Sequence, residues 1–285
     1  MNCSRQLTFG RLVAFGIAAL ASTAGHAGFI TFESAGAIPA AITPTRDAFR
    51  VAVGGGAVAG PNGSFGGARR EINWDGVPAA LSDPNSLPAN FFNSTSPRGV
   101  EFSTPGTGFL VSANGGGATP ALFGFPTEFQ TFSAQKLFTA VNSNITDVRF
   151  FVPGTANAAT TSGFAVIFTD VESLGQTKID FFDQNDLLIY SRDAMTSVNQ
   201  GLSFVGALGN AGERIGRVRI TSGLNTIVSN GQRGNPNDDA VVMDDFLYAE
   251  PIDVRVPEPG SLLLVGLGLA GLGAGRLRRR RSNTA

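Results

Sequence analysis

The chain has 285 residues and a formal charge of −1, but its charges are unevenly distributed. Seven of the 21 basic residues lie in the two ends, which hold no acidic residue, so residues 28–259 carry 14 basic against 22 acidic residues and a charge of −8. An acidic body repels phosphate backbones, which argues against nucleic-acid binding. The only cysteine, Cys3, and the only histidine, His26, lie in the first 27 residues, so the body lacks disulfides, Cys/His zinc sites and a Ser-His-Asp triad.

Residues 1–27 have the three parts of a secretory signal peptide. Arg5 and Arg11 give a positive start, residues 12–21 are apolar, and small residues follow up to Ala27. The apolar run is too short to span a bilayer, so a stable membrane helix is the weaker interpretation. We expect export through the Sec translocon, cleavage after Ala27, and a new N-terminal strand that begins with the sequence GFITFES.

Residues 28–250 are predicted to form a single all-β domain, an antiparallel two-sheet sandwich with a jelly roll as the favoured topology. The segment from 35 to 93 has weak patterning and a glycine-rich loop at 54–67, so we interpret it as an irregular N-terminal lobe. Beyond it, short apolar runs separated by turn residues indicate strands. We expect them at 100–103, 109–113, 146–152, 163–170, 214–221 and 240–249.

The clearest hairpin joins the runs TKIDFF and LLIYSR through a turn at residues 183–186. Asp180, Asp183 and Asp186 have part of the spacing of an EF-hand loop. The loop lacks the glycine at its sixth position and the terminal glutamate, so we interpret it as a turn. In the next expected strand, Arg217 and Arg219 alternate with apolar residues, which predicts one buried and one exposed face.

Asp244 and Asp245 are the most informative carboxylates, because they lie within the apolar strand VVMDDFLYA. Strand alternation predicts that one of them shares the buried face, where it needs a cation or several donors. Three partners are open: an arginine such as Arg217 or Arg219, backbone amides, or a structural Ca²⁺ ion, which carbohydrate-binding jelly rolls hold in a similar position.

Trp74 is the only tryptophan, and Asp75 follows it. An aromatic face beside a carboxylate could bind a sugar ring, whereas a tryptophan in the core would serve packing alone. The sequence indicates no catalytic residues, and we expect that the protein is not an enzyme.

The tail begins with a linker, 251–259, that ends in Pro257, Glu258 and Pro259. The apolar run 260–277 predicts a transmembrane helix of about 27 Å, and residues 278–285 a cytoplasmic basic tail. The membrane-stop cluster consists of Arg276, Arg278, Arg279, Arg280 and Arg281.

This order of Pro-Glu-Pro, apolar span and arginine cluster closely resembles the PEP-CTERM sorting signal of Gram-negative bacteria that make exopolysaccharide. The resemblance implies that exosortase is a partner, with transient anchoring in the inner membrane followed by release to the cell surface or the extracellular space. The body, with the runs INWDGVP, PANFFN, SPRGVEFSTPGTGF and VVMDDFLYAEP, resembles an uncharacterised exported family of jelly-roll type.

These features together predict a non-catalytic module of the cell surface or extracellular matrix that associates with exopolysaccharide. Two other classes stay open: a polysaccharide hydrolase or lyase on a jelly-roll fold, and a structural or adhesive envelope protein. A glycosidase would need two facing carboxyl groups about 5 to 9 Å apart, a spacing that some pair among 22 acidic residues will meet by chance.

Overall fold

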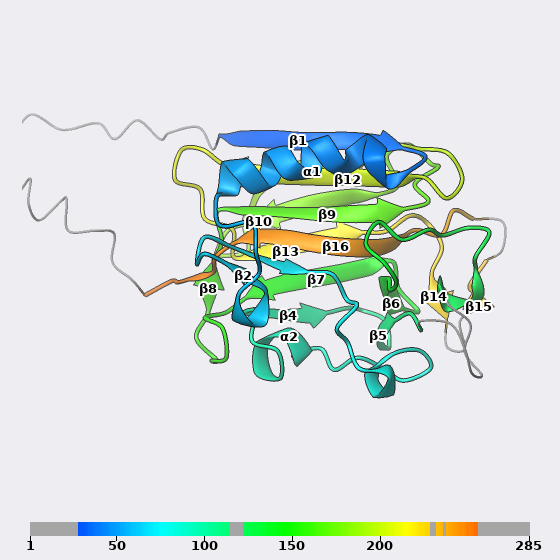
Figure 1. Ribbon diagram of the computed structural model, residues 1–285, viewed down its shortest axis with the longest axis horizontal. Helices are drawn as coiled ribbons and strands as arrows, with labels where there is room; N and C mark the ends of the chain where they lie inside the picture. The colour runs from blue at the N-terminus through cyan, green and yellow to red at the C-terminus, as the bar shows by residue number, and fades with distance from the viewer. Residues whose placement is uncertain (1–27, 114–121, 229–231, 236–237, 256–285) are drawn as a thin grey trace, which may run out of the picture.

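The computed structural model describes residues 28–113, 122–228, 232–235 and 238–255. Antiparallel sheets dominate these residues and helices are few, which confirms the predicted all-β class in its coarse form (Figure 1). The helical elements are α1 (Pro39–Val53), α2 (Phe91–Ser94) and the 3₁₀ turns η1 (Pro61–Gly63), η2 (Ala79–Leu81) and η3 (Leu122–Gly124).

The larger sheet, sheet one, has ten strands. All its strand pairs are antiparallel except β6–β14, which is parallel. Its main path runs in the order β1 (Phe29–Gly36), β12 (Leu202–Gly209), β9 (Gly163–Thr169), β16 (Val242–Ala249), β6 (Phe138–Val141), β14 (Ile227–Val228) and β15 (Gln232–Arg233). Three strands branch from this path: β3 (Arg69–Ile72) on β16, β2 (Ser64–Phe65) on β3, and β5 (Gly108–Val111) on β6.

The smaller sheet, sheet two, is fully antiparallel and has five strands. They lie in the order β11 (Leu188–Asp193), β10 (Lys178–Phe182), β13 (Arg217–Thr221), β7 (Ile145–Phe150) and β4 (Val100–Ser103). A two-stranded ribbon of β8 (Ala159–Thr160) and β17 (Ile252–Asp253) completes the strands of the described residues.

One apolar core joins the two sheets. Phe164, Val166 and Phe168 of β9 belong to the same buried cluster as Val218 and Ile220 of β13. The apolar residues Val218 and Ile220 of β13 are therefore buried as their alternation predicts. Arg217 and Arg219 lie on the opposite face of sheet two, but Arg217 is buried as well, so the face that we expected to be exposed is exposed only in part. The packing of two sheets on a shared core is compatible with a sandwich, and the jelly-roll topology stays a prediction.

Helix α1 was not expected, because residues 35–93 were interpreted as irregular. Its buried side chains, Ile42 and Phe49, are two turns apart and pack on the outer face of sheet one. The helix contains two prolines. Pro39 occupies the first turn, where proline is well tolerated, whereas Pro44 lies inside the helix and interrupts the helix pattern in the sequence. Gly54 ends the helix with a positive φ of 91° and donates its N–H to the Arg50 carbonyl.

The six strands expected between residues 100 and 249 are all present, with ends shifted by a few residues, and so are the N-terminal strand β1 and the β10–β11 hairpin. In the hairpin turn, Asp183 Oδ1 accepts the N–H groups of Asn185 and Leu187, which confirms the turn interpretation. Within the described part of the chain no helix has the length and apolar character to cross a membrane. The expected span 260–277 lies outside the described residues.

Candidate functional site

The aspartate pair lies at a β-bulge in β16. Met243 and Phe246 would point to opposite faces of a regular strand, yet both enter the core between the sheets. The register of β16 against β9 shifts by one residue between them, so two residues, Asp244 and Asp245, face a single residue of β9. The strict alternation assumed from the sequence is therefore wrong here, and both side chains are buried, at 0% and 5% exposure.

Protein donors surround this pair. The Phe132 N–H donates to Asp244 Oδ2 over 2.6 Å, and the Ser133 hydroxyl lies 3.1 Å from Asp244 Oδ1 and 2.8 Å from Asp245 Oδ1. The two carboxyl groups also bond to each other. Burial raises the pKa of Asp244 well above its usual range, and the charge of Asp245 raises it further. Two carboxyl groups this close and this buried favour sharing one proton over both being ionised.

Of the three partners predicted for this pair, an arginine such as Arg217 or Arg219 is the wrong prediction, because both bind another aspartate. Arg217 Nη1 binds Asp147 Oδ1 over 2.8 Å, and Arg219 Nη2 binds Asp147 Oδ2 over 2.9 Å. The donors to Asp244 are a backbone amide and a hydroxyl, so the prediction of backbone amides holds in part. A calcium ion at Asp244 and Asp245 stays a prediction.

Trp74 belongs to the core. Its side chain is 1% exposed and stacks on Phe138, with ring centroids 4.0 Å apart and planes 2° from parallel. Its Nε1–H donates over 2.7 Å to the backbone carbonyl of Asp244. Asp75 Oδ1 accepts the backbone N–H groups of Gln135 and Lys136. A buried indole offers no face to a sugar ring, so the structure does not support the ligand role considered for Trp74.

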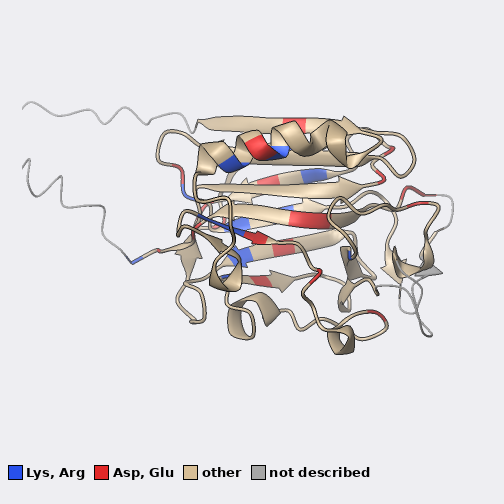
Figure 2. Ribbon diagram, in the orientation of Figure 1, with Lys and Arg blue, Asp and Glu red and all other residues tan. Residues whose placement is uncertain are grey.

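The outer face of sheet two, which we call the charged face, carries a row of polar side chains. It comprises Asp147, Arg149, Lys178, Asp180, Arg217 and Arg219, which lie on one side of β7, β10 and β13. A basic and an acidic segment lie next to each other on β7 in Figure 2. Burial raises the pKa of Asp147, but the hydrogen bonds and charges of Arg219 and Arg217 outweigh burial and hold it below its usual range. The carboxylate is therefore fixed in its ionised form.

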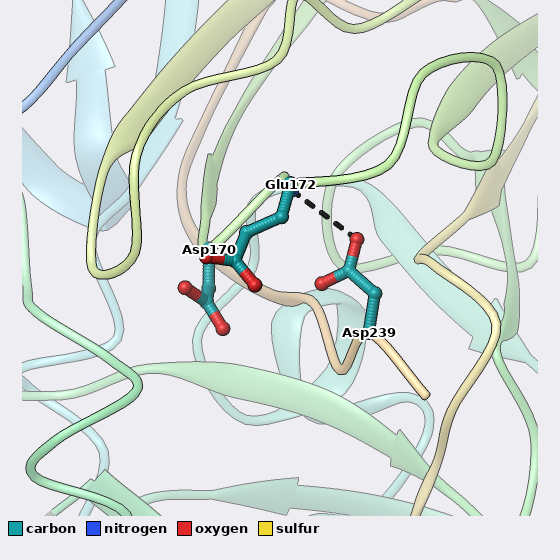
Figure 3. A group of neighbouring side chains, drawn as sticks. All are labelled: Asp170, Glu172 and Asp239. Atoms are coloured by element: carbon teal, nitrogen blue, oxygen red, sulfur yellow. Dashed lines mark hydrogen bonds between the residues drawn. The ribbon is translucent and has the colours of Figure 1, made fainter. Parts of the chain in front are cut away.

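A second acidic cluster, which the sequence analysis did not single out, consists of Asp170, Glu172 and Asp239 (Figure 3). Each offers an oxygen atom, and these atoms lie within 4.8 Å of one another. Asp170 follows β9, and Asp239 lies shortly before β16, so the antiparallel pairing of these strands brings together residues far apart in the sequence. The available signal in the sequence is that acidic residues flank two apolar strands, in the runs TDVE and NDDAVV. Only the pairing of the strands shows that these residues meet.

Burial is the largest influence on Asp170 and raises its pKa to about 7. The N–H of Gln200, which donates to Asp170 Oδ1 over 2.9 Å, opposes this shift. The negative charges of Glu172, Asp239 and Glu128 add to it. Three acidic side chains are therefore crowded together at one end of sheet one.

Comparison with known families gives one match: the PEP-CTERM protein-sorting motif matches residues 255–280. The chain carries a PEP-CTERM sorting motif. The comparisons with curated proteins and with solved structures found no match. The resemblance of the body to an exported family therefore stays a prediction.

The PEP-CTERM motif contains Pro257, Glu258 and Pro259 and four of the five predicted arginines, all but Arg281. It marks an exported protein that is anchored in the membrane before exosortase processes it and sorts it to the cell surface. The motif after residue 255 and the signal-cleavage residue Ala27 lie outside the described residues.

Proposed function

We propose that this exosortase-sorted protein is a non-catalytic surface module whose charged face associates with extracellular polysaccharide. The observation that carries the proposal is the sorting motif at residues 255–280, because it places the chain among proteins delivered to the outer surface. The charged face supports the second part, since three of its six side chains are exposed on the outer side of sheet two, opposite the inter-sheet core.

The chemistry of this face suits a chain of sugars. Arg149, Lys178 and Arg219 have side chains 48%, 39% and 42% exposed, and each also forms an ion pair with a neighbouring aspartate. Guanidinium groups bind hydroxyl and carboxylate oxygens in fixed planar geometry. Regular spacing of strands gives these donors a repeat along the sheet, which a polymer can follow.

Two properties of the carboxylates support a binding role over hydrolysis. A glycosidase needs a general acid with a raised pKa, whereas the arginines hold the pKa of Asp147 below its usual range. The pKa values of Asp244 and Asp170 are raised, but both side chains are buried, at 0% and 1% exposure, where a polymer does not reach them.

Affinity electrophoresis against the exopolysaccharide of the host tests the proposal. We expect retardation of the protein without shortening of the polymer. Polymer shortening would instead establish an enzyme, and the absence of both effects would leave a structural or adhesive role.

Substitution at the charged face makes the test specific. Arg219→Ala should weaken the retardation by roughly tenfold in apparent affinity, the scale of about 1.4 kcal/mol for one charged hydrogen-bonding group. The matched control is Arg46→Ala, because Arg46 lies on α1, which covers the opposite side of sheet one. Equal retardation of both variants would contradict binding through this face.

A further inference from the structure

One oxygen of the acidic cluster is buried and lacks a hydrogen-bond donor. The side chain of Asp170 is 1% exposed, and within the described residues it accepts one bond, from Gln200 to Oδ1. Asp239 Oδ2 accepts the N–H groups of Glu172 and Ser173, whereas Oδ1 is buried and has no partner in the described part of the chain. A buried carboxylate oxygen without a donor is costly unless a cation compensates it.

Two other partly buried carboxylates, in contrast, have arginine partners. Glu71 pairs with Arg50 and Arg69, and Asp147 pairs with two arginines. None of Asp170, Glu172 and Asp239 forms an ion pair with the described residues. Three carboxylates so close together repel one another, and a bound cation would turn this repulsion into attraction.

The backbone on both sides of the cluster is hydrogen-bonded to neighbouring segments. The N–H of Asp170 donates to the Gly201 carbonyl over 2.8 Å. The carbonyl of Asp239 accepts the N–H of Asn225 over 2.9 Å. These bonds hold the backbone on both sides of the cluster, while the Glu172 side chain is exposed.

The donor set selects a hard cation. All candidate ligands are carboxylate oxygens, and the chain after residue 27 has neither histidine nor cysteine. Calcium accepts six to eight oxygens in flexible geometry and completes its shell with water, whereas magnesium demands a near-ideal octahedron. A three-carboxylate site with one exposed ligand fits calcium better.

We propose that Asp170, Glu172 and Asp239 form a Ca²⁺ site that ties the end of β9 to the segment preceding β16. The ion joins two neighbouring strands of sheet one at the end where β9 finishes and β16 begins. It binds the folded protein only, because residues 170 and 239 meet only when these strands pair, and it therefore stabilises the fold by mass action. The site is independent of the polysaccharide proposal, which concerns the other sheet.

The test is calcium titration calorimetry and thermal melting of the full chain in detergent, with CaCl₂ and with chelator. We expect wild type to bind calcium and to melt at a higher temperature in its presence. Asp170→Asn and Asp239→Asn should each lose at least about tenfold in calcium affinity and most of the melting shift, since carboxylate number sets affinity in such sites.

Two controls localise the effect. Asp183→Asn makes the same charge change in the β10–β11 turn, where asparagine is equally suited, and should keep the whole shift. Asp244→Asn separates this site from the aspartate pair in β16 and should also keep it. Loss of the shift in Asp244→Asn with full retention in Asp170→Asn would move the calcium to the pair and overturn the proposal.

Folding defects are separable from loss of the ion. In chelator, the cluster variants should melt at or above wild type, because each removes one of three repelling charges. If they melt lower, Glu172→Gln, an exposed substitution, still has to weaken calcium binding. An unchanged affinity in Glu172→Gln, no calcium response of wild type, or an equal response to magnesium would each overturn the proposal.

Discussion

Three aspartates of this protein lie in three different electrostatic environments. Asp147 lies between two arginines, which hold its pKa below the usual range. Asp244 is buried and bonded to a second carboxyl group, and its pKa is raised. Asp170 is buried among other acidic groups and its pKa is raised to about 7. These environments correspond to an ion pair, a shared proton and a candidate cation site.

The shared proton predicts the effect of two substitutions at Asp244. Asparagine reproduces the protonated carboxyl, because its amide donates to Asp245 and its oxygen accepts the Phe132 N–H, so Asp244→Asn should change stability by less than about 1 kcal/mol. Asp244→Ala leaves the buried Phe132 N–H unpaired and should cost roughly 1–3 kcal/mol. Urea denaturation near neutral pH measures both. Equal destabilisation by the two variants would contradict proton sharing.

The same pair predicts a pH dependence. Burial, then the charge of Asp245, raises the folded-state pKa of Asp244 above its unfolded value. The resulting stability is complete below the unfolded pKa, about 3.9, and is lost as the pH rises through the folded pKa. Two charged groups near Asp245 act in opposite directions: Glu71 raises its pKa and Arg50 lowers it. In denaturation series from pH 4 upward, wild type should lose this stability as the pH rises, and Asp244→Asn should lack the loss.

At the scale of elements, prediction succeeded where one strand or turn contains its own signal. The apolar residues of β13 alternate with arginines, and the Asx residues of the β10–β11 turn bond their own backbone, so both were predictable. The bulge at Asp244 was not, because its register depends on β9 and on Trp74, whose indole accommodates the displaced Asp244 carbonyl. Helix α1 was missed because only Ile42 and Phe49 mark its buried side.

Helix α1 depends on these few anchors, which predicts a large effect of Phe49→Ala. Phe49 is fully buried and makes edge contacts with Phe32 and Phe204, at 5.4 and 6.1 Å between centroids. Removing the ring should cost about 3–5 kcal/mol. The control Val51→Ala, whose side chain is 81% exposed, should stay within about 0.5 kcal/mol. Denaturant unfolding measures both, and similar values would show that α1 does not pack stably on sheet one.

For the whole molecule, strand directions separate two ends of sheet one. Strand β1 begins and β16 finishes at the same end, so residues 28 and 255 lie on one side of the molecule (Figure 1). The cluster of Asp170, Glu172 and Asp239 lies at the other end, where β9 finishes and β16 begins. The sorting motif was predictable because its parts are consecutive in the sequence. The cluster was not, because it depends on the pairing of distant strands.

The terminal segments predict a doubly processed surface protein. Signal cleavage after Ala27 would convert the Gly28 nitrogen into an ammonium group, and this nitrogen already lies 2.5 Å from Glu213 Oε1. The new N-terminus would therefore gain an ion pair where a chain continuing from Ala27 has only an N–H bond. Exosortase cleavage near Pro257–Glu258–Pro259 would remove the apolar run and arginines that follow. Mass spectrometry of protein from the cell surface should find Gly28 as the first residue and no peptide from 262–281. A surface form that retains the arginines would contradict processing at the motif, and one that starts before residue 28 would contradict cleavage after Ala27.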